Sequence, residues 1–161
     1  MEPSESRPDK LSGGCLCGSI RYTITITPDM EWPPTHNGSC QCTLCRKFTG
    51  ALVHQGCTFP NSAISPQFTS NASYTQFASS EKGVRGFCRV CGSSLTFNYI
   101  GLDKTEILLG TVDEEILKSK VGTELCSSKD HSWCENAVKA VTDIMPGNLW
   151  SQEHGSEKIS Q

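Results

Sequence analysis

Ten cysteines in a chain of 161 residues are the feature that most constrains what this sequence can fold into. Thiolates at short spacings are ligands for soft metal ions, above all zinc. Seven of the ten fall into three compact groups: Cys15 and Cys17 in GGCLCGS, Cys40, Cys42 and Cys45 in GSCQCTLCRKFTG, and Cys88 and Cys91 in FCRVCGS. Cys57, Cys126 and Cys134 stand alone. The fold must therefore bring these groups together around one or more metal ions.

The cellular compartment decides between metal ligands and disulfides. The first residues, MEPSESRPDKLSGG, are polar and charged and contain no apolar run typical of a secretory signal. Because thiols stay reduced in the cytoplasm, we expect a cytoplasmic protein whose cysteines bind metal. The alternative is that the CxC and CxxC pairs are redox-active thiols or disulfides without metal.

Composition excludes some function classes and sets the domain count. The formal net charge is -3 and no Lys/Arg-rich run occurs, so we predict no nucleic-acid partner. Apolar runs fall far short of the ~20 residues that cross a bilayer, so we predict no membrane span. The length fits one domain of ~100–200 residues. We predict a flexible leader at residues 1–11, a zinc-binding domain at 12–150 and a polar tail at 151–161.

The hydrophobic pattern predicts a mainly β fold of small antiparallel sheets. Ile20, Tyr22, Ile24 and Ile26 alternate with polar residues, which is the period of a half-buried strand. We expect further strands at 94–101 and 105–112, and around 53–59 and 74–77. A turn of helix is expected in DEEILK.

One short C-terminal helix is also expected. Ser132 and Glu135 have the spacing of a capping box, and an apolar helical face follows. Pro146 and Gly147 would end this helix.

The first and third cysteine groups together can complete one tetrahedral zinc site. Cys15, Cys17, Cys88 and Cys91 supply four thiolates, the ligand set of structural zinc. The CxxCG sequence at Cys88–Cys91 is typical of a zinc knuckle, and in a flat strand both side chains of CxC would leave the same face. We predict a structural zinc that ties the start of the chain to a later sheet.

The middle group supplies only three sulfurs. Three protein ligands and an open fourth position are typical of catalytic zinc, and a soft three-thiolate ion would accept a thiol substrate. A closed site is the alternative, with Cys57, His36 or His54 as the fourth ligand. The residues alone leave both arrangements open.

Three segments, GGCLCGSIRY, CQCTLCRKFTGA and FCRVCGSSLTF, together resemble the glutathione-dependent formaldehyde-activating enzyme / centromere protein V family. The resemblance runs from about Gly13 to Trp133. It implies a tented zinc-binding β-fold with two zinc ions per chain. By this resemblance, the structural zinc is held by Cys15, Cys17, Cys88 and Cys91, and the catalytic zinc by Cys40, Cys42 and Cys45.

The activity implied by the resemblance is that of a zinc-dependent carbon–sulfur lyase. Family members condense glutathione reversibly with formaldehyde to S-hydroxymethylglutathione, and others act on related small molecules, including intermediates of secondary metabolism. The sequence departs from the family pattern at Gln41, where members usually have histidine, and in the spacing of Lys129 and Trp133. The alternative functions are a non-catalytic zinc-stabilised binding or scaffold module and, third, a redox sensor.

A few other residues are candidates for the site. Arg46 and Lys47 follow the triplet and would bind the carboxylates of a co-substrate such as glutathione, or else form a solvated loop. His54 is a candidate general acid/base, with a partly buried structural histidine as the alternative. We interpret His131 and the three isolated cysteines as structural. The expected partner is a small-molecule substrate, with a thiol-containing compound as one option, and homodimerisation is left open.

Overall fold

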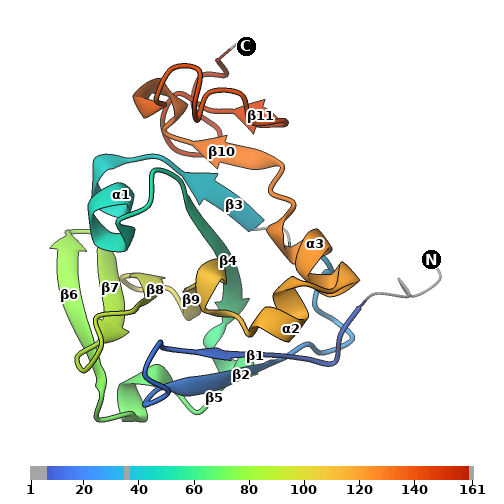
Figure 1. Cartoon of the computed structure of the whole chain (residues 1–161), viewed down its shortest axis with the longest axis vertical. Coiled ribbons are helices and arrows are strands. Elements are labelled where there is room, and N and C mark those ends of the chain that lie inside the picture. Colours follow the sequence, from blue (N-terminus) through green and yellow to red (C-terminus); the bar gives the residue numbers. More distant parts are fainter. Residues whose placement is uncertain (1–6, 35–36, 160–161) are drawn as a thin grey trace.

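The structure is a computed structural model that describes residues 7–34 and 37–159. His36, one of the three alternative fourth ligands, lies outside the described residues. The chain forms a three-stranded and an eight-stranded sheet. In Figure 1 the small sheet lies below β4 and β9, and β10 and β11 lie at the opposite end, near the C-terminus.

The small sheet is antiparallel and has the strand order β1-β2-β5. Its strands are β1 (Lys10–Gly14), β2 (Arg21–Thr25) and β5 (Ile64–Ser65). Tyr22 and Ile24 of β2 are buried, whereas Arg21 and Thr25 are exposed. The predicted alternation in this segment is thus confirmed, because one face of the sheet packs on the core and the other faces solvent.

The large sheet has the strand order β11-β10-β3-β4-β9-β8-β7-β6. Its strands are β3 (Asn37–Cys40), β4 (His54–Pro60), β6 (Tyr74–Ser80), β7 (Gly83–Cys88), β8 (Ser94–Tyr99), β9 (Lys104–Leu108), β10 (Asp130–Ser132) and β11 (Asn148–Leu149). Most neighbours are antiparallel, but β10 pairs in parallel with both β3 and β11. The predicted strands at 53–59, 74–77 and 94–101 match β4, β6 and β8. The strand predicted at 105–112 is confirmed only in its first half, because β9 ends at Leu108 and a 3₁₀ turn, Leu109–Thr111, follows.

In the described part of the chain, three short α-helices accompany the sheets: α1 (Thr43–Thr49), α2 (Glu114–Leu117) and α3 (Lys120–Cys126). The expected turn at DEEILK is α2. In Figure 1, α2 and α3 lie beside β1, and α1 lies near β6 and β7. A single buried cluster joins residues of both sheets and α3, including Leu11, Ile24, Leu95, Ile107 and Leu125.

The mainly β class with small sheets and few helices is confirmed, but the expected C-terminal helix is wrong. Ser132, the predicted N-cap, pairs in β10 with Cys40 of β3. Trp133 and Ala140 have φ of 59°, a left-handed conformation that ends a right-handed helix. Only a 3₁₀ turn, Cys134–Asn136, follows. Strand pairing outweighed the local capping signal.

Residues beyond the predicted domain end also bond to the sheet region. The amide of Trp133 donates to the carbonyl of Gln152 at 2.8 Å, and Trp150 forms an isolated bridge with Lys158. The predicted boundaries at 11/12 and 150/151 remain a prediction.

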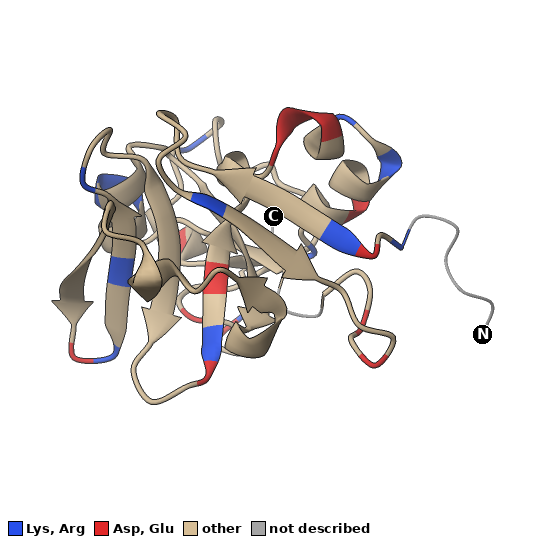
Figure 2. Ribbon diagram, turned by 90° about the horizontal axis from the view of Figure 1, so that it is seen from below, with Lys and Arg blue, Asp and Glu red and all other residues tan. Residues whose placement is uncertain are grey.

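The distribution of charged residues and the length of the helices concern the predictions on nucleic acid and on a membrane span. Figure 2 shows lysine and arginine interspersed with aspartate and glutamate along the ribbon. Among the described residues, no helix is long and apolar enough to cross a bilayer.

Candidate functional site

The middle cysteine group forms a cluster at the junction of β3 and α1. Cys40 ends β3, Cys42 is the N-cap of α1, and Cys45 lies in the first turn. The three sulfurs lie within 4.8 Å of one another, an arrangement that could hold a metal ion. Among the described residues, no further His, Cys, Asp or Glu joins this group.

Backbone amides at the start of α1 donate hydrogen bonds to two sulfurs of this cluster. The Cys45 amide donates to the Cys42 sulfur at 3.3 Å, and the Cys42 amide donates to the Cys40 sulfur at 3.4 Å. Cysteine sulfur thus takes the N-cap role that serine or aspartate usually has. Hydrogen bonding from the Cys40 thiol, followed by that from Cys45, lowers the pKa of Cys42. Deprotonated sulfur is the form that binds metal.

A buried arginine faces the cluster, and sequence reasoning missed it. Arg85 of β7 is 5% exposed, and its Nη2 donates to the Cys45 sulfur at 3.5 Å. Its guanidinium lies 5.2 Å from the ring centre of Phe48 and 4.9 Å from that of Phe97. Among the described residues no carboxylate pairs with it, and its Nη1 is buried without a partner.

A buried guanidinium without a carboxylate needs another source of negative charge, because an uncompensated buried ion costs several kcal/mol. The cysteine cluster is the source at hand. Three thiolates around a divalent ion carry one net negative charge, which Arg85 would balance. The donor set and this counter-charge therefore fit a zinc ion.

The cluster lies in the wall of a cavity of about 590 Å³. The cavity is lined by residues of β3, β4, β8, β9 and the C-terminal segment: Asn37, Gly38, Ser39, Cys40, Cys42, Cys45, His54, Gly56, Thr58, Phe97, Tyr99, Leu102, Lys104, Glu106, Asp130, Ser132, Trp133, Glu153 and His154. We call it the cysteine cleft. Its size suits a small organic molecule, for which sites commonly measure ~300–1,000 Å³.

His54 enters this cleft beside the cluster, as its candidate role requires. It stands directly opposite Cys40 in the β3–β4 ladder, so both side chains leave the same face of the sheet. Its Nε2 lies 2.5 Å from Oε1 of Glu106, and the two side chains are 4% and 19% exposed. Glu106, in β9, was not singled out from the sequence.

Tyr99 adds a hydroxyl to the same cleft. Burial, reinforced by the negative charges of Glu106, Cys40 and Cys45, raises the pKa of its phenol. The phenol is therefore protonated at neutral pH and can donate a hydrogen bond into the cleft. Its ring packs edge-on against Phe97 with the centroids 4.8 Å apart.

The isolated cysteines and His131 lie apart from the cluster. Cys57 faces the core from the opposite side of β4, and burial raises its pKa. His131 accepts a hydrogen bond from the Ser39 hydroxyl at Nδ1 (2.6 Å) and donates from Nε2 to the Pro146 carbonyl (3.0 Å). Both contacts are structural. Burial likewise raises the pKa of Cys126 and of Cys134.

Gln41, the departure from the family pattern, points away from the cleft. Its side chain is fully buried, accepts from the Thr142 hydroxyl at 2.6 Å and donates to the Thr142 carbonyl at 3.0 Å. It thereby fastens the C-terminal segment beside the cluster. Arg46 donates to the carbonyl of Asn136 at 3.0 Å, and Lys47 is exposed. Neither lines the cleft, and their role as carboxylate ligands remains a prediction.

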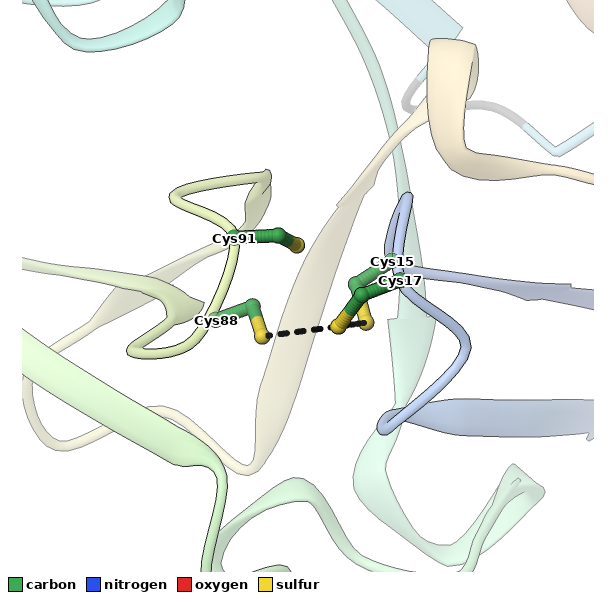
Figure 3. Close-up of side chains that lie close together, drawn as sticks. All are labelled: Cys15, Cys17, Cys88 and Cys91. Carbon is green, nitrogen blue, oxygen red and sulfur yellow. Dashed lines mark hydrogen bonds between the residues drawn. The ribbon is translucent and has the colours of Figure 1, made fainter.

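The other four grouped cysteines form a second cluster, shown in Figure 3, where side chains from two loops point toward one another. Cys15 and Cys17 lie in the β1–β2 loop rather than in a strand, whereas Cys88 is the last residue of β7 and Cys91 lies in the β7–β8 loop. All four sulfurs lie within 4.8 Å of one another, with 3.6 Å between Cys15 and Cys17 and 3.9 Å between Cys17 and Cys88.

Hydrogen bonds shape the turn that follows Cys88 and join it to the loop that carries Cys15 and Cys17. Gly92, with φ of 76°, makes the turn after Cys91, and its amide donates to the Cys88 carbonyl at 2.8 Å. Hydrogen bonding by Ser93 lowers the pKa of Cys91 to about 5. Ser93 Oγ also accepts from the Leu16 amide at 2.9 Å, which joins the two loops directly. The four sulfurs could hold a metal ion.

The fold and the two clusters define a class, namely a mainly β protein with two cysteine sites that could bind metal. The glutathione-dependent formaldehyde-activating enzyme family matches residues 10–136, which is most of the chain. The chain therefore belongs to that family, as the motifs predicted.

Similarity to solved structures and to curated proteins is limited. A crystal structure of a Rhodobacter sphaeroides protein is similar to this chain, with 18% identity, a TM-score of 0.48 and coverage of 67% of this chain and 95% of that one. No curated protein matches the chain significantly.

Proposed function

We propose that this protein is a zinc-dependent carbon–sulfur lyase that acts on an adduct of a thiol, such as glutathione, with a small carbonyl compound. The observation that carries the proposal is the three-sulfur cluster in the wall of a cleft that also holds His54 and Glu106. Membership of a family linked to glutathione and formaldehyde supports it.

The residues of the cleft have distinct roles in this proposal. Cys40, Cys42 and Cys45 would hold the zinc ion, which when bound supplies Lewis acidity toward a thiolate or a carbonyl oxygen. Arg85 balances the charge of the thiolates. The Tyr99 hydroxyl is placed to donate a hydrogen bond to the substrate.

His54 is the base of the proposed reaction. In the cleavage direction its imidazole accepts the hydroxyl proton of the adduct, the carbonyl double bond forms, and the carbon–sulfur bond breaks with its electron pair on sulfur. In the addition direction the protonated imidazole returns that proton to the oxygen. The products are a thiolate and a carbonyl compound, so no oxidant or reductant is consumed.

The test is formation of S-hydroxymethylglutathione by the zinc-loaded protein from glutathione and formaldehyde, followed by NMR exchange against the uncatalysed rate. We expect acceleration by the wild-type protein and loss of nearly all of it in Cys42→Ser. Cys134→Ser, which changes a buried cysteine away from the cluster, is the matched control and should retain activity.

A different outcome would favour the binding or scaffold module. If the wild-type protein carries two zinc ions and accelerates neither this reaction nor that of other thiols with small aldehydes, the lyase proposal is wrong.

A further inference from the structure

We propose that Glu106 is a positioning residue of the reaction: it fixes the ring of His54 beside the cysteine cluster, and Gly56 provides the space that lets it do so. This inference rests on the proposed function for its kinetic consequence. The orientation of the ring itself is a property of the free protein and can be measured separately.

The register of the strands shows why the contact needs a special arrangement. Glu106 stands opposite Thr58, four residues along β4 from His54. Four residues of strand span roughly 13 Å. The two side chains can meet at 2.5 Å only by leaning toward each other along the strand, across the residue between them on the same face. That residue is Gly56.

Gly56 leaves the space through which Glu106 passes. A Cβ added at this position would lie 2.1 Å from Oε1 of Glu106 and 2.7 Å from its Cδ and Cγ. No real side chain tolerates such distances, so even alanine would push the carboxylate aside. Because the obstructed group is the end of a flexible side chain, the backbone can stay in place.

The chemistry of the pair follows from its geometry. A carboxylate accepts hydrogen bonds, so the His54 Nε2–H donates to Glu106. This contact holds the proton of the neutral imidazole on Nε2 and leaves Nδ1 as the ring's acceptor. A carboxylate that fixes the tautomer and the ring orientation of a histidine is a recurring arrangement in both hydrolytic and metal sites.

The kinetic test compares two independent ways of breaking the contact. Glu106→Ala removes the carboxylate, whereas Gly56→Ala displaces it and leaves Glu106 in the chain. We expect kcat to fall by roughly 10- to 100-fold in both, with the KM for the adduct within about twofold, since partners of this kind commonly contribute that much. Glu106→Gln keeps an acceptor of the same shape and should recover part of the loss.

The controls are chosen outside the cleft. Gly110→Ala adds a Cβ that meets nothing within 4 Å, and Glu114→Gln changes an exposed glutamate on α2 that pairs with Lys118. Both should behave as wild type.

The second readout is the tautomer of His54, from long-range ¹H–¹⁵N NMR of the histidine rings, with the signal assigned by His54→Asn. We expect the proton on Nε2 in the wild type and a mixture of tautomers in Glu106→Ala and Gly56→Ala. An unchanged tautomer in both variants would overturn the proposal. So would an unchanged kcat in an active protein whose tautomer has shifted. An inactive wild type with a shifted tautomer would refute the lyase function while leaving the positioning of the ring established.

Discussion

The proposed chemistry of the cysteine cleft depends on a few single residues, and some of them contribute through their charge. Arg85 is the clearest example, because it is buried, faces Cys45 and has no carboxylate partner among the described residues. A guanidinium in such a place stabilises an anionic cluster and is stabilised by it.

Replacing Arg85 by methionine should weaken zinc binding at the triplet by about 10- to 100-fold, the range found for groups adjacent to metal ligands. Arg85→Lys keeps the charge but not the two-sided stacking on Phe48 and Phe97, so its loss should be smaller. Zinc competition against a chromophoric chelator measures both. Equal affinity in wild type and Arg85→Met would show that the charge is not needed for the metal.

Gln41 also acts at the scale of one residue, through two buried hydrogen bonds to Thr142. Gln41→Ala leaves the Thr142 carbonyl without the Gln41 donor and the Thr142 hydroxyl without its acceptor, although the hydroxyl still accepts from the Val138 amide. We expect a loss of about 1–3 kcal/mol in the free energy of unfolding. Urea denaturation gives this value, with Gln55→Ala, an exposed neighbour, as the control. Zinc content at the triplet should not change. A stability equal to wild type would mean that the contact with Thr142 contributes nothing.

At the scale of elements, ionic contacts join the small sheet to the start of α2. Asp113 receives hydrogen bonds from both terminal nitrogens of Arg21 in β2, at 2.8 and 2.6 Å, and from the Ser12 hydroxyl of β1 at 2.6 Å. Asp113 is the N-cap residue of α2, but its side chain makes no capping bond because it is engaged by these partners.

This contact predicts how the stability of the folded protein depends on pH. Hydrogen bonding by Arg21 holds the pKa of Asp113 below its ordinary value of 3.8. A lowered pKa in the folded state stabilises the protein above the ordinary pKa, and this stabilisation is lost as the pH falls through the lowered value. Asp113→Asn should therefore be less stable than wild type at pH 7; the difference should start to shrink near pH 3.8 and disappear only once the pH is below the lowered pKa. Unfolding curves across this range measure it; a constant difference would contradict the assignment.

At the scale of the whole molecule, the two cysteine clusters have different consequences for folding. The four-cysteine cluster joins the β1–β2 loop to the end of β7 and the β7–β8 loop, and Cys88 is fully buried in the core. The triplet joins only the end of β3 to the first turn of α1, and these two segments are adjacent in the sequence. Closing the long loop constrains the unfolded chain far more than closing the short one.

We therefore expect Cys88→Ser to unfold the protein and Cys42→Ser to leave it folded. Zinc in small structural sites contributes on the order of 10 kcal/mol, so the loss of one ligand there is not tolerated. Circular dichroism and thermal melting distinguish the two variants. With a chelator, the triplet ion should leave first while the fold persists. Equal unfolding of both variants would make the triplet a structural site.

Local sequence patterns predicted much of this molecule. The period-two alternation around Tyr22 predicted β2, and the CxxCG spacing predicted a knuckle turn, since both depend on neighbouring residues. The capping signal at Ser132 failed because its strand partner, Cys40, lies far away in the sequence. Helix α1 was missed because a cysteine at its N-cap resembles a metal ligand rather than a capping residue.

The sequence by itself determined the grouping of the cysteines, because local turns of the chain at each motif place its sulfurs close together. The fold then brings Cys15 and Cys17 to Cys88 and Cys91, so that three and four sulfurs could each hold a metal ion. Only the tertiary structure decided what surrounds them. Glu106 reaches His54 across 52 residues of sequence, and Arg85 reaches Cys45 across 40. Such contacts depend on strand order and register, which no local pattern encodes. The cysteine groups could therefore be predicted from the chain, whereas Arg85 and Glu106, which we propose to balance charge and orient the histidine, were found only in the fold.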